Sequence, residues 1–313
     1  MASDVYVMHA AKHARDDEFY TPMACVRDEL NNYDWSGKRV FCCCDTMESA
    51  FVQYFQTQPV RCIYTLGYSL GDSTEKQTLH AIDGQGRRLS YCYDVQGCER
   101  RGDCQQLFLP GVAASVDRRG GRATFETSPA FNDGLRMCDV VVTNPPFSKL
   151  RTLLPLLADS GKQFLILGPV TAMNYKDVFE LLKQGRLHAG HICDKKYYFE
   201  RPDDVPTGVN ITWYTNLPVP QRQAFVPKNG YTSDDLKRLG LWKVFDDRPD
   251  VLYIGKVADI PVDYYGPMAV PPSAFFRFLD GCWEFLEPDH FCSMHVDGIE
   301  CFARIVVRRK RGA

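Results

Sequence analysis

The sequence lacks any run of about 18 apolar residues, the length that a membrane-spanning helix needs. Residues 1–20 also lack the apolar core of a secretory signal. No charge of one sign predominates, because 37 Lys and Arg stand against 39 Asp and Glu. We therefore expect a cytoplasmic protein with no contact with membranes. The near-neutral balance argues against a large sequence-independent nucleic-acid surface and is compatible with a local one.

The thirteen cysteines lack the spacing of a zinc finger or of a disulfide framework. Three of them fall in VFCCCD, residues 40–45, an apolar stretch typical of a strand, where cysteine acts as a small hydrophobe. Cys98 and Cys104 lie close together, but no second pair stands at zinc-ligand spacing. We expect no metal site, and reduced thiols of the kind found in the cytoplasm.

What is present is a regular alternation of strand-like and helix-like segments. Strands are expected at 38–44, 60–66, 139–144, 163–169, 187–193 and 208–217, and helices at 21–33, 47–55, 129–138, 148–161 and 175–185. Ser128 precedes the third of these helices and is placed to cap it. Such alternation is typical of an α/β fold with a mostly parallel sheet that helices cover on both faces.

Two regions depart from this alternation. Residues 68–124 interrupt it and contain, at 77–97, a pattern typical of a β-hairpin with a glycine-rich turn. Beyond residue 216 the chain becomes irregular and rich in proline, with late strands expected at 282–287 and 302–309. We expect a β-rich insertion in the first case. In the second case we expect a smaller, irregular C-terminal lobe or strands added to the edge of the sheet.

The segment DVVVTNPPFS, residues 139–148, carries the most specific chemistry. Ligands of α/β sheets bind at the carboxyl ends of the strands, and this strand ends in Asn144, Pro145, Pro146 and Phe147. An aromatic amine is a poor nucleophile, because its lone pair is delocalised into the ring. The side-chain oxygen of Asn144 and the carbonyl of Pro145 can accept its two N–H groups, while Phe147 stacks on the ring.

Asn-Pro-Pro also occurs in ordinary turns, so the motif alone leaves a purely structural interpretation open. Its position after a hydrophobic strand favours the chemical interpretation. The double proline holds carbonyl groups in place at low entropic cost. The expected reaction is methyl transfer from a donor with a good leaving group, which implies a sulfonium. A second polar residue, Asp45, marks the end of the strand at 38–44.

NPPF resembles the catalytic motif of amino-group methyltransferases that use S-adenosylmethionine. A set of segments that keeps its order along nearly the whole chain resembles the EcoRI-type adenine-specific DNA methyltransferases: DEFYTP at 17–22, CCCD at 42–45 followed by SAFVQYF at 49–55, residues 139–148, KVADIPVDYYGPMAVP at 256–271 and VDGIECFARIVVRRKR at 296–311. This resemblance implies a Rossmann-like methyltransferase fold, with a catalytic domain at 1–216 and a C-terminal region at 217–313 that recognises DNA and adds edge strands. It also implies S-adenosylmethionine as the cofactor.

Residue by residue, the resemblance implies two groups of site residues. The target adenine would be held and activated by Asn144, Pro145, Pro146 and Phe147. The donor would be bound over its methionine part by Tyr20, Thr21 and Pro22, and by a loop that replaces the glycine-rich turn of many relatives and contains Cys44, Asp45, Thr46 and Ser49.

The implied substrate is double-stranded DNA. The amino group of adenine lies inside the base stack, so the target must be flipped out of the duplex. Because the net charge is only −2, contacts with phosphate must be concentrated in one place. The candidates are Lys195, Lys196, Arg201, Arg308 and Arg309. For residues 197–199, Tyr-Tyr-Phe, we prefer core or edge-strand aromatics to base-stacking aromatics. The basic C-terminus is equally compatible with a solvated tail.

We interpret the chain as a monomeric, site-specific adenine DNA methyltransferase of a restriction-modification system or of a phage or host protective system. A cognate restriction endonuclease is the implied partner. Two alternatives stay open. One keeps the chemistry and changes the substrate to RNA or to a glutamine side chain of a protein. The other is a DNA-binding protein with weakened catalysis that acts by occupying its site.

Overall fold

The computed structural model describes residues 21–69, 76–93, 125, 128–193, 195–199, 207–219, 224–278, 281–289, 295–301 and 304–311. The chain divides into two compact units. The first is drawn from Met1–Gly168 and Lys195–Leu217, and the second from Pro169–Asp194 and Pro218–Ala313. Tyr20 and Arg201, two of the predicted site residues, lie outside the described residues, as does most of the predicted insertion at 68–124.

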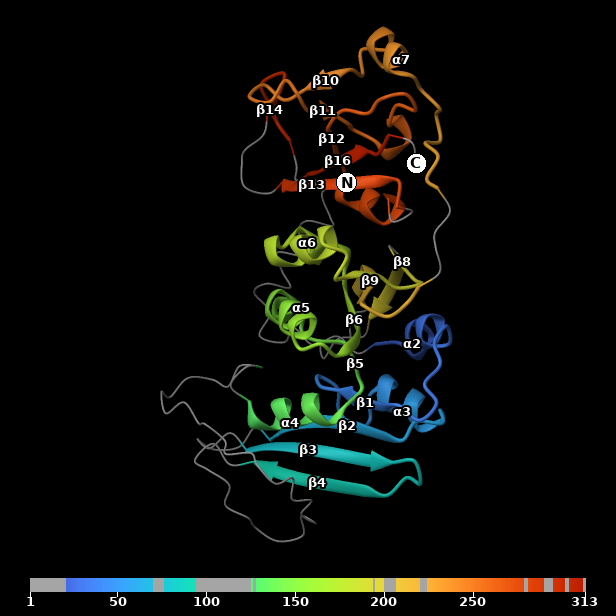
Figure 1. The fold of residues 1–313 in the computed structure, drawn as a ribbon, viewed down its shortest axis with the longest axis vertical. Coiled ribbons are helices and arrows are strands. Elements are labelled where there is room, and N and C mark those ends of the chain that lie inside the picture. Colours follow the sequence, from blue (N-terminus) through green and yellow to red (C-terminus); the bar gives the residue numbers. More distant parts are fainter. Residues whose placement is uncertain are drawn as a thin grey trace, which may run out of the picture. The chain divides into compact units, whose positions relative to one another are not determined.

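The first unit is built on a sheet that contains parallel and antiparallel pairs of strands (Figure 1). Its elements are α2 (Met23–Leu30), β1 (Arg39–Cys42), α3 (Ala50–Gln56), β2 (Cys62–Ser69), β3 (Lys76–Asp83), β4 (Arg88–Tyr93), α4 (Pro129–Met137), β5 (Val140–Thr143), η1 (Phe147–Lys149), α5 (Leu150–Asp159), β6 (Gln163–Pro169), β8 (Lys195–Phe199) and β9 (Thr207–Thr215). The strands follow the order β4-β3-β2-β1-β5-β6-β9, and β8 pairs with β9. The series β2-β1-β5-β6 is parallel, whereas β3, β4 and β8 pair antiparallel. The predicted α/β architecture around a sheet with parallel strands is thus confirmed.

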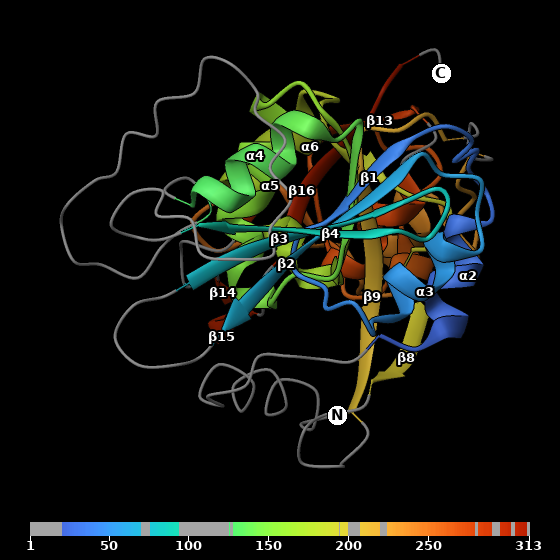
Figure 2. The ribbon, with the colours of Figure 1, turned by 90° about the horizontal axis from the view of Figure 1, so that it is seen from below.

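The strands β1 and β5 are neighbours at the point where the strand order reverses: the chain adds β2 on one side of this pair and β6 on the other. From β1 it passes through α3 to β2 on one side, and from β5 it passes through η1 and α5 to β6 on the other. Because such crossovers are right-handed, the two connecting helices cover opposite faces. Figure 2 shows α2 and α3 on one face of the sheet and α4 and α5 on the other. A ligand crevice in an open α/β sheet forms at the carboxyl ends of the strands at such a reversal.

At the amino ends of β1 and β5, away from the carboxyl ends, an ion pair fixes the register of the two strands. Arg39, the first residue of β1, donates to Asp139 from its backbone N–H (2.8 Å) and from Nη2 of its guanidinium (2.6 Å). These bonds lower the pKa of Asp139. Val40 then lies opposite Val140. Because both strands rise equally per residue, the loop after β1 is brought beside the end of β5.

The predicted hairpin at 77–97 is confirmed as β3 and β4, which pair antiparallel. Gly86 has a φ of +77° in the connecting turn, where its N–H donates to the carbonyl of Asp83 over 2.9 Å. A glycine suits this left-handed conformation because it has no Cβ. Strand β3 also pairs antiparallel with the whole of β2. The hairpin therefore extends the central sheet, a pairing that the sequence pattern did not reveal.

Strand β5 is buried along its whole length, and each of its residues exposes at most 1% of its surface. A continuous apolar run without alternation is what a parallel strand covered on both faces requires. Helix α4 begins as predicted after Ser128, whose hydroxyl accepts from the N–H of Phe131 over 3.1 Å. Phe131 packs on Phe41 of β1, with ring centres 5.7 Å apart. Capping and packing together hold α4 on the sheet.

The second unit has a sheet of its own. Its elements are η2 (Val170–Asn174), α6 (Lys176–Lys183), β7 (His188–Ala189), α7 (Ser233–Arg238), β10 (Lys243–Val244), β11 (Leu252–Tyr253), η3 (Val257–Asp259), β12 (Met268–Val270), η4 (Pro272–Phe278), β13 (Trp283–Asp289), β14 (His295–Val296), β15 (Ile299–Glu300) and β16 (Arg304–Arg309). The strand order is β10-β11-β12-β16-β13, and β14 pairs with β15. The late strands predicted at 282–287 and 302–309 correspond to β13 and β16. The strand predicted at 187–193 is shorter than expected, because only β7 forms there.

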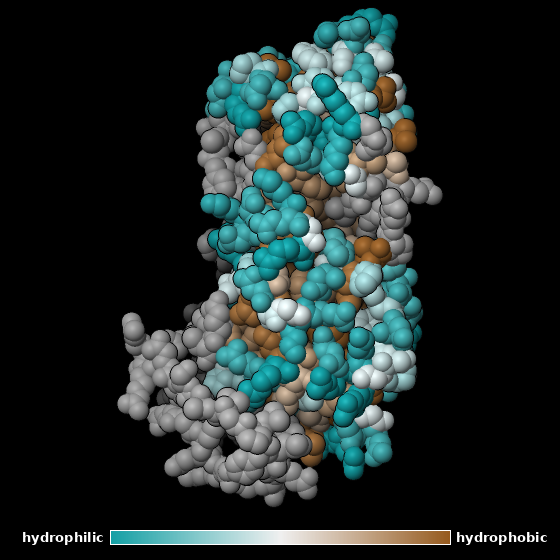
Figure 3. Space-filling view, viewed as in Figure 1, coloured by the Kyte–Doolittle hydropathy of each residue, from teal (hydrophilic) through white to brown (hydrophobic). Residues whose placement is uncertain are grey.

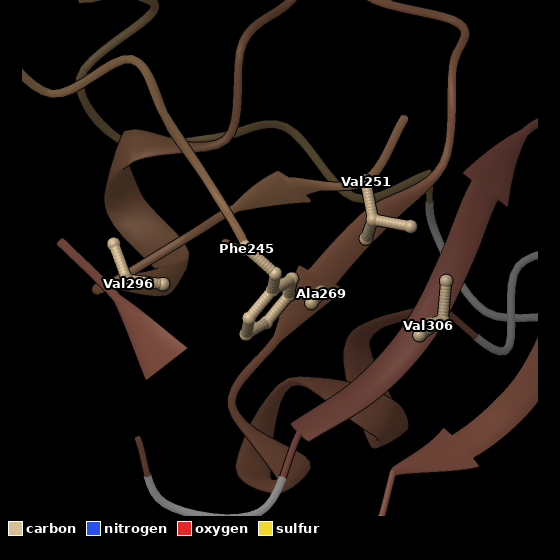
Figure 4. Packing of buried hydrophobic residues seen from close by; sticks show 5 residues of the cluster. All are labelled: Phe245, Val251, Ala269, Val296 and Val306. Atoms are coloured by element: carbon tan, nitrogen blue, oxygen red, sulfur yellow. The ribbon is translucent and has the colours of Figure 1, made fainter. Parts of the chain in front are cut away.

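Apolar side chains from distant parts of the second unit form its core. Phe245, Val251, Ala269, Val296 and Val306 are buried together (Figure 4). Helix α6 buries one side and exposes a polar side, which is visible over this helix in Figure 3. None of the helices that the structure describes combines the length and the apolar character that a membrane crossing requires.

Candidate active site

Thr143, the last residue of β5, joins the two strand ends at the reversal. Its hydroxyl donates to Oδ2 of Asp45 over 2.5 Å and accepts from the backbone N–H of Cys44 over 3.0 Å. Thr143 is fully buried and Asp45 exposes only 7% of its surface. The loop after β1 and the segment after β5 are therefore held together through one side chain.

Asp45 is a buried carboxyl group at the end of β1. Burial raises its pKa from 3.8 to about 7. Hydrogen bonds from the Thr143 hydroxyl, the backbone N–H of Asn144 and the Ser49 hydroxyl oppose this rise, because they stabilise the ionised form. Such a group titrates near neutral pH, and a cation beside it would favour ionisation. Perturbed carboxyl groups of this kind are typical of functional sites.

Asn144 follows β5 directly and is half-buried. Its Nδ2 donates to the hydroxyl Oγ1 of Thr21 over 2.9 Å. Thr21 lies immediately before Pro22, the residue that caps α2 and whose carbonyl accepts from the N–H of Val26 over 3.3 Å. The fold thus brings the start of α2 onto the Asn-Pro-Pro-Phe motif.

The two prolines lead the chain away from β5. Pro145 is buried, and Pro146 has a φ of −49° and a ψ of 130°. Neither proline has an N–H, so the backbone offers only acceptors here. Phe147 is half-buried and begins η1, in which the N–H of Lys149 donates to the carbonyl of Pro146 over 2.8 Å. The motif is thereby tied directly to the start of α5.

The loop between β1 and α3, residues 43–49, contains no glycine. Its shape depends on hydrogen bonds instead. The N–H of Ser49 donates to the carbonyl of Thr46 over 3.1 Å, and the Ser49 hydroxyl accepts from the N–H of Val52 over 3.3 Å. Cys44 and Ser49 are half-buried and Thr46 is exposed. The predicted donor loop therefore lies beside the end of β5 and keeps polar atoms accessible.

Lys195, a predicted DNA contact, is bound within the first unit. Its Nζ lies 2.7 Å from Oδ2 of Asp28 and 4.8 Å from the centre of the Tyr197 ring. The Tyr197 hydroxyl donates to the same carboxylate over 2.5 Å. Hydrogen bonds from Lys195 and then Tyr197 lower the pKa of Asp28. This lysine fastens β8 to α2 in the structure.

The two C-terminal arginines are also bound within their own unit. Arg308 forms an ion pair with Glu284 on the neighbouring strand, with 2.6 Å between Nη2 and Oε2. Arg309 donates to the carbonyl of Val262, and its guanidinium lies 5.0 Å from the centre of the Trp283 ring. These contacts fasten β16 to β13 and to the segment that contains Val262.

Lys196 and Tyr198 form an exposed pair on β8. Residues 197–199 were predicted to be core or edge-strand aromatics, and the structure agrees: Tyr197 and Phe199 are buried, whereas Tyr198 exposes 64% of its surface on β8, a strand that pairs with β9. Nζ of Lys196 lies 5.6 Å from the centre of the Tyr198 ring. On β9 the residue opposite Tyr198 is Gly208, where an added Cβ would lie 2.5 Å from Cε of Lys196. Glycine at this position leaves room for the lysine to lie across the strand.

Within the part of the chain that the structure describes, no group of three or more His, Cys, Asp or Glu side chains is arranged to hold a metal ion. The cysteines whose side chains are described are free thiols. Burial raises the pKa of Cys42 and Cys43 well above the usual value, so these two are poor nucleophiles.

Sequence reasoning missed Thr143 as a site residue, and it did not predict the bond that Thr21 forms. Thr143 is the one polar residue of β5, and a polar side chain at the end of a wholly buried strand is a signal that can be recognised in a sequence. Thr21 was assigned to the donor, whereas the structure places its hydroxyl on the amide of Asn144. No pattern in the sequence indicates a bond between residues so far apart.

Comparisons with known proteins give a consistent result. A family model described as adenine-specific methyltransferase EcoRI matches residues 7–297. The chain is 29% identical over 289 residues to the type II methyltransferase M.MpnI of Mycoplasma pneumoniae, which covers 85% of this chain and 81% of that protein. It is 27% identical over 336 aligned positions to the type II methyltransferase M.EcoRI of Escherichia coli, which covers 97% of both. M.MgeORF184P of Mycoplasma genitalium is 26% identical over 284 residues, or 83% of this chain and 79% of that protein. No solved structure matches the chain.

Proposed function

Because the chain belongs to the family of the adenine-specific methyltransferase EcoRI, we propose that it transfers a methyl group from S-adenosylmethionine to the exocyclic 6-amino group of an adenine in double-stranded DNA. The observation that carries this proposal is the position of Asn144. Its amide stands at the end of β5, where the chain reverses its direction across the sheet, and follows a threonine that binds a buried carboxyl group. We propose a Rossmann-like methyltransferase fold, since a crevice at such a reversal suits a nucleoside donor.

The residues around the end of β1 fit S-adenosylmethionine. When bound, this cofactor supplies a methyl group on a positively charged sulfonium, and it carries ammonium and hydroxyl groups that need acceptors. Asp45, with a pKa of about 7, is a carboxyl group that a neighbouring cation would ionise. We assign donor binding to this carboxylate and to the polar atoms of Cys44, Thr46 and Ser49, together with Tyr20, Thr21 and Pro22, which the family resemblance implies.

Asn144 and Pro145 activate the target amine by accepting hydrogen bonds from its two N–H groups. The nitrogen must become tetrahedral before it can attack, and in that geometry its two N–H groups point to Oδ1 of Asn144 and to the Pro145 carbonyl. Both acceptors are held in place before the substrate arrives, so the stabilisation is preorganised. Pro146 fixes the turn, and Phe147 offers a face on which the flipped adenine stacks.

Among the candidates, we propose Lys196, together with Tyr198, as the main DNA contact. Lys195, Arg308 and Arg309 already bind groups of the protein, whereas Lys196 and Tyr198 are exposed beside each other. A lysine that contacts phosphate and a ring that stacks on a base are a common combination in nucleic-acid binding. Arg201 remains a further candidate, and residues 217–313 are the proposed recognition region. The proposed setting is a restriction-modification system, with a monomeric enzyme and a cognate endonuclease.

Transfer of labelled methyl groups tests the function. The purified chain is incubated with donor carrying a tritiated methyl group and with DNA from a host that lacks DNA methylation, with RNA, or with protein. We expect label in DNA alone, and 6-methyladenine after digestion of the DNA to nucleosides. Label in RNA or in glutamine would show that RNA or protein, and not DNA, is the substrate. Failure of the donor to bind in calorimetry would support a DNA-binding protein with weakened catalysis.

Removing the exposed pair on β8 is expected to weaken DNA binding. Lys196→Gln should raise the Kd for DNA about fivefold and lower the slope of log Kd against log salt by about 1, because one phosphate contact is lost. Tyr198→Ala should raise the Kd by about fivefold or more with the slope unchanged, because stacking does not release counterions. Fluorescence anisotropy at several salt concentrations measures both quantities. Lys176→Gln, which removes an exposed lysine at the start of α6 and outside residues 217–313, is the control, and equal slopes for Lys196→Gln and wild type would contradict the assignment.

A further inference from the structure

We propose that Thr21 is a positioning residue for Asn144, and that its hydroxyl stabilises the orientation in which the oxygen of the asparagine amide faces the target base. The inference rests on the proposed function and deepens it. It also changes the role of Thr21, for which the family resemblance implied a place over the donor. The observation is the hydrogen bond of 2.9 Å from Nδ2 of Asn144 to Oγ1 of Thr21.

An asparagine that serves as an acceptor has an orientation problem. The two ends of its amide have nearly the same shape, but only the oxygen can accept from an N–H group. The terminal torsion of asparagine is broad and roughly two-fold, so an unrestrained amide samples both orientations. In the reversed orientation, the NH2 group of Asn144 would face the N–H groups of the target amine. That arrangement would oppose the reaction.

The bond to Thr21 stabilises the orientation that the reaction requires. With Nδ2 held by Oγ1 of Thr21, Oδ1 is the end of the amide that points away from Thr21. A threonine hydroxyl can donate as well as accept, so it would tolerate either end of the amide on its own. The target amine offers only donors on the other side, so the two neighbours together are satisfied in one orientation.

Thr21 is itself well supported. The proline that follows it restricts its backbone to extended geometry, and that proline caps α2. The far end of α2 is fastened to α3 through Asn31, whose Oδ1 accepts from the Tyr54 hydroxyl over 3.0 Å. The carbonyl of Leu30 also accepts from Nε1 of Trp35 over 2.8 Å.

Asn144 is supported from its own side. The preceding residue, Thr143, is fully buried, and two prolines follow. The backbone N–H of Asn144 also bonds to Asp45, which contributes to the pKa of that carboxyl group. Both partners of the bond between Thr21 and Asn144 are therefore fixed before a substrate binds, as preorganised catalysis requires.

Three variants separate orientation of the amide from binding of the donor. Thr21→Val has the shape of threonine without the hydroxyl, and Thr21→Ser keeps the hydroxyl. The full-length proteins are compared in single-turnover methyl transfer at saturating labelled donor, with DNA from a host that lacks methylation. We expect Thr21→Val to lower the rate constant about tenfold or more while the donor Kd changes by less than about twofold. Thr21→Ser should stay within about threefold of wild type.

The third variant tests the orientation directly. Asn144→Asp replaces the amide with a carboxylate, whose two oxygens are equivalent, so reversal of this side chain has no consequence. Adding Thr21→Val to Asn144→Asp should therefore lower the rate constant by less than about threefold, compared with tenfold or more in the presence of Asn144. Equal losses in both backgrounds would show a general structural effect and would overturn the inference.

The remaining outcomes also decide the question. A Thr21→Val protein with a raised donor Kd and a normal rate constant at saturation would place the residue on the donor, and a protein indistinguishable from wild type would make the bond dispensable. Thermal unfolding checks the fold. If the valine variant unfolds, Thr21→Ala is judged by the same criteria. Failure of the wild type itself to methylate DNA would contradict the proposed function, whereas methylation by the wild type with any of these contrary results contradicts this inference alone.

Discussion

Replacing Asn144 with alanine is expected to lower the rate of methyl transfer by about 100-fold or more. The variant loses the side-chain oxygen that accepts from the target amine, and the Pro145 carbonyl cannot replace it. Donor affinity should change by less than about twofold, because the carboxyl group of Asp45 and the loop at 43–49 are intact. Single-turnover transfer of tritiated methyl groups and calorimetric titration of the donor measure the two effects.

Asn132→Ala is the matched control. Asn132 is exposed on α4, outside the candidate site and outside residues 217–313, so its loss should leave the rate unchanged. An Asn144→Ala protein with near-normal turnover and a normal KM would remove the assignment of Asn144 as the acceptor. The proposed reaction would then need a different acceptor for the target amine.

The same inactive variant reports on base flipping, because it binds DNA without modifying it. Flipping an adenine out of a duplex costs a few kcal/mol of unpairing free energy, and this cost is lower when the adenine faces a mismatched or missing base. A duplex with such a site should therefore bind more tightly than the matched duplex. Dissociation constants for both duplexes at one fixed salt concentration are required, because phosphate contacts depend on salt. Equal affinities would argue against a flipped adenine in the complex.

Asp45→Asn is expected to remove the pH dependence of donor binding. With a pKa of about 7 in the free protein, about a tenth of the Asp45 carboxyl groups are ionised at pH 6 and about nine tenths at pH 8. If the ionised form binds the cationic donor, donor affinity should rise about ninefold over this interval in the wild type. The asparagine variant should show a flat profile and an affinity about tenfold lower at pH 8, because it carries no charge. Calorimetry across the pH range measures both proteins.

The stability of the fold should change with pH in the opposite direction. Because the pKa of Asp45 is raised above its usual 3.8, the folded chain binds this proton more tightly than the unfolded chain does. Below about pH 4, Asp45 therefore does not lower the free energy of unfolding. Between about pH 4 and pH 7 it lowers this free energy progressively, and above about pH 7 it lowers it by a constant amount. Glu48→Gln changes an exposed carboxyl group in the same loop and is the control, since its pH dependence should match that of the wild type. A wild-type donor affinity that is independent of pH would contradict the role of Asp45.

The sequence by itself determined the local features of this protein. The alternation of strands and helices, the hairpin at 77–97, the cap at Ser128 and the late strands could all be predicted, because each depends on residues that are neighbours in the chain. The placement of Asn-Pro-Pro-Phe at the end of a buried strand is also local. So is the absence of glycine from the loop at 43–49.

Only the tertiary structure decided which side chains meet. The register that Arg39 and Asp139 set between β1 and β5 brings the hydroxyl of Thr143 to Asp45, and no local pattern contains that register. The same holds for the bond between Thr21 and Asn144. Packing also decided that Lys195 bonds to Asp28 while Lys196 and Tyr198 stay exposed, although two identical lysines stand side by side in the sequence. Charge and hydrophobic periodicity describe what a residue can bind, whereas its partner depends on which distant strand or helix is folded beside it.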